Sequence, residues 1–137
     1  MQTRYQDPIA LTGRVLLGLL FVLSGTGKIF GFDGTVAYIA AKGLPLPQIV
    51  AVLTLCVELG GGLMLVFGLF TRPAAFGLAV FTVLAALIFH NFWAATEAMR
   101  MGQQTHFLKN LSIAGGMLVL AAFGPGALSV DARRGRA

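Results

Sequence analysis

Long apolar stretches separated by short breaks organise this chain, at about residues 9–30, 48–70, 73–93 and 107–123. Each stretch holds roughly the 20 residues that an α-helix needs to cross a bilayer. Residues 35–42 form a shorter stretch, which we expect to be an interfacial helix capped by Asp33. Residues 94–105 are more polar and are expected to be a loop or another interfacial helix. The pattern predicts an all-α protein, an integral membrane four-helix transmembrane bundle with a short interfacial helix between spans one and two.

The composition agrees with a membrane protein of one domain. Only 11% of the residues are charged, whereas soluble domains average about 25%. A chain of 137 residues is expected to fold as a single domain, residues 1–137. The net charge of +5 comes from scattered basic residues, except for Arg133, Arg134 and Arg136 near the C-terminus. This distribution favours contact with anionic membrane lipids and argues against a nucleic-acid partner.

Four crossings would place both termini on the same side of the membrane. The arginines on that side would be Arg4, Arg72, Arg133, Arg134 and Arg136. The opposite loops offer Lys42 and Arg100. Because cytoplasmic loops are enriched in Lys and Arg, both termini are predicted to be cytoplasmic. Residues 9–30 also have features of a signal peptide, but no clear A-x-A site follows them, so we expect them to form the first span.

Three ionisable side chains, Arg14, Glu58 and His90, interrupt the apolar stretches. A charge at membrane depth is costly unless it is paired, hydrated or used. Arg14 lies about five residues into its span and Glu58 near the middle of its own, an axial separation of roughly 8 to 9 Å. Because an arginine side chain can cover most of that distance, we predict an Arg14–Glu58 ion pair.

A second group of polar side chains gathers toward the opposite face. Its members are Ser24, Lys28, His90, Asn91, Lys109 and Asn110. Glu58 approaches this group from below, so we predict an outward-opening pocket lined by Lys28, Glu58 and His90. The alternatives are that the lysines extend to the lipid head groups, that the two asparagines only link helices, and that His90 is an ordinary interfacial histidine.

The sequence offers little support for other kinds of chemistry. A single cysteine, Cys56, cannot form an intrachain disulfide or a CxxC pair. His90 and His106 are the only histidines, too few for a metal or haem site with one acid nearby. No dinucleotide or phosphate-loop fingerprint is present. We expect no metal, haem or nucleotide cofactor, and no redox centre belonging to the chain itself.

A series of short motifs runs through nearly the whole chain. It comprises Arg14 with Phe21, Gly25 and Lys28, then Glu58 with the glycines up to Gly62, Phe67-Gly68-Leu69-Phe70-Thr71-Arg72, His90, and Gly124-Pro125-Gly126 with Ser129 and Asp131. In order and spacing this series resembles the DoxX family of small four-helix bacterial inner-membrane proteins. The resemblance implies relatives that are membrane subunits of sulfur and thiol redox systems, including a thiosulfate:quinone oxidoreductase, partners in oxidative-stress complexes, or assembly factors.

The predicted pocket and the resemblance together favour a quinone- or quinol-interacting subunit of a membrane redox complex. Lys28 and His90 would hydrogen-bond a quinone oxygen, and Glu58 would relay protons. The remaining cofactor-binding candidates are Arg14, Ser24, Asn91, Lys109 and Asn110. Arg14 would set the charge state of Glu58. A protein partner would supply the electrons or the thiol chemistry.

Two other functions remain open from the sequence. In a non-catalytic scaffold or assembly factor, the ion pair would set helix register and the face formed by Gly60–Gly62 would dock a partner span. A small-molecule permease would need more room than four short helices offer, which a homo-oligomer could provide.

Overall fold

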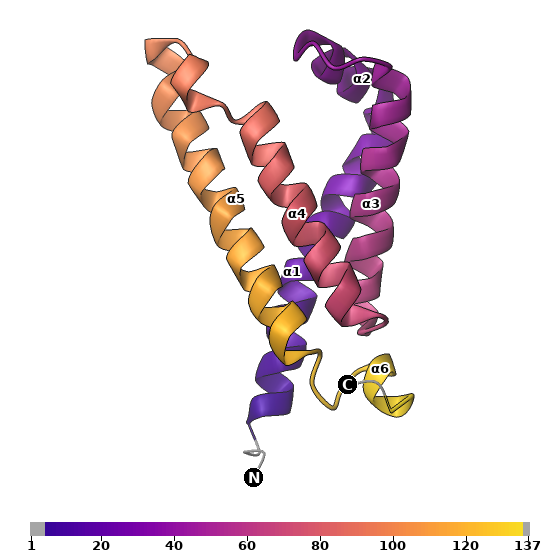
Figure 1. Cartoon of the computed structure of the whole chain (residues 1–137). Helices are drawn as coiled ribbons and strands as arrows, with labels where there is room; N and C mark the ends of the chain where they lie inside the picture. The colour runs from indigo at the N-terminus through magenta and orange to yellow at the C-terminus, as the bar shows by residue number, and fades with distance from the viewer. Residues whose placement is uncertain (1–4, 136–137) are drawn as a thin grey trace.

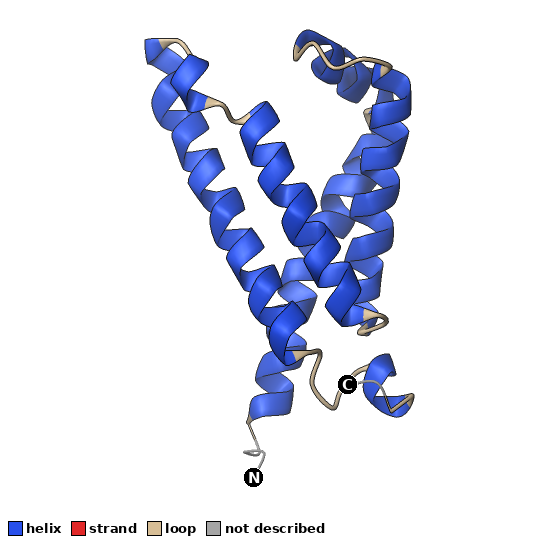
Figure 2. Cartoon of the chain, in the orientation of Figure 1, coloured by secondary structure: helices blue, strands red, loops and turns tan. Residues whose placement is uncertain are grey.

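The computed structural model describes residues 5–135, and all regular structure within that range is helical (Figures 1 and 2). The helices are α1 (Gln6–Phe30), α2 (Phe32–Ala41), α3 (Pro47–Phe67), α4 (Thr71–Phe89), the 3₁₀ turn η1 (Phe92–Ala94), α5 (Glu97–Phe123) and α6 (Val130–Arg133). Four segments, which contain α1, α3, α4 and α5, are long and apolar enough to cross a membrane. The predicted all-α four-helix membrane bundle is confirmed. Arg4 and Arg136 lie outside the described residues.

The break between α1 and α2 falls on Gly31, which ends the first helix and begins the second. Asp33 lies in the first turn of α2, and α2 has no side-chain cap, so the predicted Asp33 cap is wrong. The reason is that the chain passes from one helix into the next across a single residue. Ile39 of α2 is buried, and Tyr38 stacks on Phe89 of α4 with ring centroids 5.4 Å apart. The short helix therefore packs over one end of the bundle.

Helix α5 begins at Glu97, about ten residues before the start that hydrophobicity predicted. The expectation of a loop or separate helix at 94–105 is wrong for most of that stretch. Residues 97–106 are polar, but most of them favour the helical backbone. A polar surface does not interrupt a helix, and α5 extends past the apolar stretch as one rod of 27 residues.

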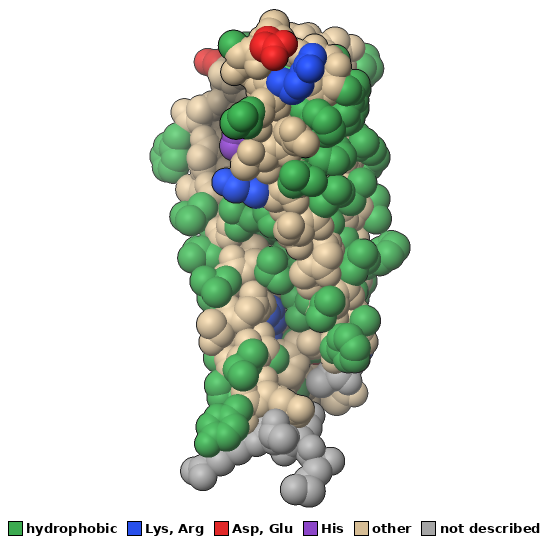
Figure 3. Space-filling model, turned by 90° about the vertical axis from the view of Figure 1, so that its left-hand side faces the viewer, with side chains coloured by type: hydrophobic (Ala, Val, Ile, Leu, Met, Phe, Trp, Pro, Cys, Tyr) green, Lys and Arg blue, Asp and Glu red, His purple; other side chains and the backbone are tan. Residues whose placement is uncertain are grey.

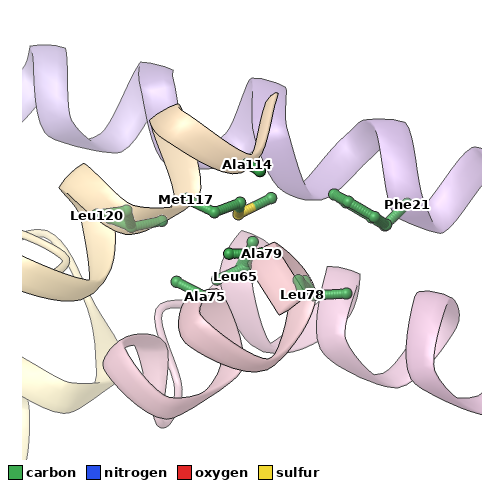
Figure 4. Packing of buried hydrophobic residues seen from close by; sticks show 8 residues of the cluster. All are labelled: Phe21, Leu65, Ala75, Leu78, Ala79, Ala114, Met117 and Leu120. Carbon is green, nitrogen blue, oxygen red and sulfur yellow. The ribbon is translucent and has the colours of Figure 1, made fainter. Parts of the chain in front are cut away.

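The four long helices form two pairs, α1 with α3 and α4 with α5, which are close at one end and diverge toward the other (Figure 1). The hydrophobic core lies where the pairs converge, and Figure 4 shows side chains from all four helices meeting there. Its members are Phe21, Leu65, Ala75, Leu78, Ala79, Ala114, Met117 and Leu120. The diverging end has no comparable core, and α2 lies across the α1–α3 side of it.

Glycines allow α1 and α3 to approach closely. A Cβ atom built on Gly18 would lie 2.8 Å from the carbonyl oxygen of Gly62, and one on Gly25 would lie 3.0 Å from the backbone nitrogen of Leu59. No side chain separates the two backbones at these points. The close approach sets how far side chains of one helix can reach across the other.

The C-terminal segment closes the converging end. Asp131 accepts hydrogen bonds from the backbone nitrogens of Phe70 and Thr71 and from the Thr71 hydroxyl, at 2.8 to 2.9 Å. Arg72 donates to the carbonyl oxygens at the end of α5. Asp7 of α1 accepts from the backbone nitrogen of Ala127. The Asp131 and Asp7 bonds attach the segment to the α3–α4 turn and to α1, and the Arg72 bonds link α4 to the end of α5.

Candidate functional site

The diverging ends of the two helix pairs line an open cavity of about 890 Å³. Its walls are mainly apolar and include the aromatic rings of Phe81 and Phe89 and the aliphatic side chain of Ile88. Its polar lining comes from Ser24, Lys28, Thr35, Tyr38, Thr54, Glu58, Thr82, His90, His106, Lys109 and Asn110. An apolar slot of this size with a few polar groups is typical of a small-molecule site.

An ion pair between Lys28 of α1 and Glu58 of α3 is the central polar feature of the cavity. The Lys28 ammonium lies 2.6 Å from Oε2 of Glu58 and also donates to the Ser24 hydroxyl at 2.8 Å. Glu58 is 7% exposed. Ser24 precedes Lys28 by one helical turn, and the close α1–α3 approach at Gly25 brings the carboxylate within reach. Because the Lys28 side chain is 23% exposed, removing one partner is expected to cost less than the about 3–5 kcal/mol typical of a fully buried pair.

His90 sits on the opposite helix pair, at the C-terminal end of α4. Its Nδ1 lies 2.9 Å from Oε1 of Gln103, and its ring stacks on His106 of α5 with centroids 5.1 Å apart. With the Gln103 carboxamide oxygen facing it, Nδ1 is assigned as the donor of this bond, and the same assignment leaves Nε2 of a neutral ring as an acceptor. His90 lines the cavity, and the ring nitrogen that is not bonded to Gln103 has no hydrogen-bond partner among residues 5–135.

Residues of α5 complete the polar wall. Lys109 and Asn110 line the cavity as part of the same helix as Gln103 and His106. The spacing of His106, Lys109 and Asn110 places all three on one helix face. Sequence reasoning did not include His106 or Gln103 in the site. The signal that could have found them is this same-face spacing, which becomes visible once the helix is taken to begin at Glu97.

Arg14 does not belong to this cavity, and the predicted Arg14–Glu58 ion pair is wrong. Arg14 is 2% exposed, and its guanidinium donates to the carbonyl oxygens of Leu128 at 2.9 Å and Pro125 at 3.5 Å. Along α1 it lies about 21 Å from Lys28. Lys28 pairs with Glu58, and Arg14 meets carbonyl groups of the folded-back C-terminal segment.

Asn91 also lies apart from the cavity lining. Its side-chain oxygen accepts a hydrogen bond from Lys42 at 3.2 Å, which joins the end of α2 to the turn after His90. This arrangement fits a link between elements better than contact with a ligand. The structure thus brings together Ser24, Lys28, Glu58, His90, Lys109 and Asn110, and leaves out Arg14 and Asn91.

Comparison with known proteins identifies the family. The DoxX family model matches residues 9–91, which include Lys28, Glu58 and His90. The chain belongs to the DoxX family. It is 42% identical over 131 residues to the inner membrane protein YqjF of Escherichia coli K12, covering 93% of each chain. It is 39% identical over 125 residues to the inner membrane protein YphA of the same organism, covering 91% of this chain and 89% of YphA.

A third relative is more distant and matches only part of the chain. The Bacillus subtilis 168 protein named "Putative oxidoreductase CatD" is 35% identical over 75 residues, which are 55% of this chain and 54% of CatD. No solved structure gives a significant match. The comparisons and the four apolar helices together describe a DoxX family membrane protein with inner-membrane relatives.

Proposed function

We propose that this DoxX family protein is a quinone- or quinol-interacting subunit of a membrane redox complex. The observation that carries the proposal is the division of polar groups between the two cavity walls. The Lys28–Glu58 pair lies on the α1–α3 side, and His90 lies on the α4–α5 side. A quinone ring has an oxygen at each end. It would fit a cavity that has polar side chains on two opposite walls and apolar side chains between them.

The residues present fit a quinone head group. Lys28 has a third ammonium hydrogen besides those directed at Ser24 and Glu58, and can donate it to a ring oxygen. Nε2 of neutral His90 can accept from a hydroxyl of the reduced ring. Phe81 and Phe89 supply flat apolar surface for the ring itself.

A quinone, when bound, supplies two-electron chemistry that is coupled to proton uptake. In the proposal, Glu58 holds or releases a proton next to Lys28, and His90 does so on the other wall. A partner protein supplies the electrons. The printed name of the partial relative, "Putative oxidoreductase CatD", agrees in reaction class with this proposal.

Quinone titration of the purified protein in lipid nanodiscs tests the proposal. With a short-chain ubiquinone as probe, we expect Glu58→Gln and His90→Ala to weaken binding by at least about tenfold, equivalent to ~1.4 kcal/mol. Glu97→Gln is the matched control, because Glu97 lies in the first turn of α5 and does not line the cavity. Its affinity should equal that of the parent protein.

A double variant separates binding from folding. Glu58→Gln alone leaves the Lys28 ammonium without its counter-charge, whereas Lys28→Gln with Glu58→Gln removes both charges together. The double variant should recover thermal stability and still bind ubiquinone poorly. Ubiquinone affinity that stays unchanged in Glu58→Gln and His90→Ala would refute the quinone site.

The second candidate is a membrane scaffold or assembly factor, favoured by one observation on α3. A Cβ atom at Gly60 would meet nothing within 4 Å, so this position is open for a partner span. Gly61 and Gly62 face inward against Leu78 and Gly18, so the docking face is narrower than the glycine triplet suggests. A scaffold predicts that Gly60→Leu abolishes partner co-purification while ubiquinone affinity stays unchanged.

A further inference from the structure

The charges that line the cavity do not balance. Lys28 is neutralised by Glu58, but Lys109 makes no ion pair or hydrogen bond within residues 5–135. The chain has five acids in total. Asp7 and Asp131 are bonded at the converging end, and Asp33 and Glu97 stand at the starts of α2 and α5. Within the described chain, no acid neutralises Lys109.

The depth of Lys109 makes this imbalance significant. Along α5, Lys109 lies about 21 Å from Phe123 at the closed end, within a hydrocarbon core of about 30 Å. A charge inside the span is unfavourable without a partner or water. On the face formed by α5, a few basic side chains and a histidine stand among hydrophobic ones (Figure 3). No described acid supplies the counter-charge, so an anion from outside the chain, or water at the open end of the cavity, is left to compensate Lys109.

We propose that Lys109 and its neighbours on α5 form an anion-recognising subsite that binds the acidic oxygen of an amphiphile. His106 lies on the same helix face one turn before Lys109, and Asn110 lies beside it. The apolar body of the ligand would lie against Phe81 and Ile88 on the facing helix α4. The acidic oxygen belongs either to a free amphiphilic acid or to the phosphate of a membrane phospholipid. The subsite goes beyond the proposed quinone function, because neither a quinone nor a quinol carries a carboxylate or phosphate group.

Two probes with the same chain and different head groups test the subsite. Laurate and dodecanol are titrated by calorimetry into the full-length protein in mild detergent. We expect the parent protein to bind laurate at least about tenfold more tightly than dodecanol. Lys109→Gln should bind the two alike, whereas Lys109→Arg should keep the preference because it keeps the charge. Lys42→Gln is the control, because Lys42 bonds Asn91 and does not line the cavity.

A lipid measurement identifies the source of the acidic oxygen. Native mass spectrometry would compare phosphatidylglycerol retained by the parent protein and by Lys109→Gln after mild delipidation. Lipid lost only from the variant supports the subsite and assigns a phospholipid phosphate. A laurate preference without retained lipid supports the subsite and assigns a free acid. Equal binding of laurate and dodecanol by the parent, with lipid retention unchanged by Lys109→Gln, would overturn the proposal. The readouts contain no quinone, so they fail or succeed separately from the proposed function.

Discussion

Arg14 shows how main-chain carbonyl groups can stabilise a buried cation. Its two terminal nitrogens contact the carbonyl oxygens of Pro125 and Leu128, while its Nε has no hydrogen-bond partner among the described residues. Gly68 lies directly against the guanidinium, in a left-handed backbone conformation with φ of 68°. The guanidinium is therefore bonded to the C-terminal segment on one side and packed against Gly68 on the other, where a side chain would collide with it.

Gly68→Ala is expected to destabilise the protein strongly. The added Cβ would lie 2.0 Å from Nη1 of Arg14 and 2.5 Å from Cβ of Ser129. The left-handed backbone adds about 1–2 kcal/mol, so we expect a total loss of at least about 2 kcal/mol. Thermal unfolding in detergent measures it. Gly77→Ala is the control, because its Cβ would meet nothing within 4 Å, and it should leave the unfolding temperature unchanged or slightly raised. Equal unfolding temperatures for the two variants would contradict this account.

The pairing of α1 with α3 controls the geometry of the cavity. Gly18 and Gly62 face each other across the helix contact, and Gly25, one turn before Lys28, lies against Leu59, the residue after Glu58. The short distance between the two helices is what lets Lys28 reach Glu58. Wider separation would leave both charges poorly compensated in an apolar surrounding.

Gly62→Ala is expected to separate α1 from α3. Its Cβ would lie 2.9 Å from the Gly18 carbonyl oxygen, which is backbone and cannot rotate away. Overpacking of this kind costs about 1–3 kcal/mol. Gly60→Ala, on the same helix with nothing within 4 Å, serves as the matched control. Thermal unfolding of both variants should give a lower temperature for Gly62→Ala alone. Because Ala is a better helix former than Gly, an equal loss of stability in Gly60→Ala would contradict the account based on the α1–α3 contact.

The molecule is asymmetric along the direction of its long helices. Both described termini lie at the converging end, where the C-terminal segment covers the bundle (Figure 1). The cavity lies between the helix pairs at the diverging end. If the arginine-rich converging end is cytoplasmic, the cavity opens toward the opposite half of the membrane.

Reporter fusions test this orientation. Alkaline phosphatase fused at either terminus should be inactive, and green fluorescent protein at the same sites should be fluorescent, because both termini are predicted to be cytoplasmic. Phosphatase fused after Ala95, between η1 and α5, should be active. The reverse pattern at all three sites would show that the arginine bias does not set the topology.

The sequence pattern alone was sufficient to predict the membrane spans and to identify the polar residues within them. Each span is a run of apolar residues long enough to cross a bilayer, and the cost of burying a charge marks Lys28, Glu58 and His90 wherever the helices pack. Those three side chains do line one cavity. Their role as a site remains a prediction.

Only the tertiary structure showed which side chains the charged residues contact. Axial depth alone made Arg14 the nearest partner for Glu58, but depth does not give the rotation of α1 about its axis or the path of the C-terminal segment. Rotation and close glycine contacts direct Lys28 to Glu58, and the returning segment supplies carbonyl groups to Arg14. His106 lines the cavity because α5 continues as a helix through its polar N-terminal residues. A hydrophobicity pattern does not predict a helix there. Hydrophobicity depends on neighbours along the chain, whereas each of these pairings depends on residues far apart in it.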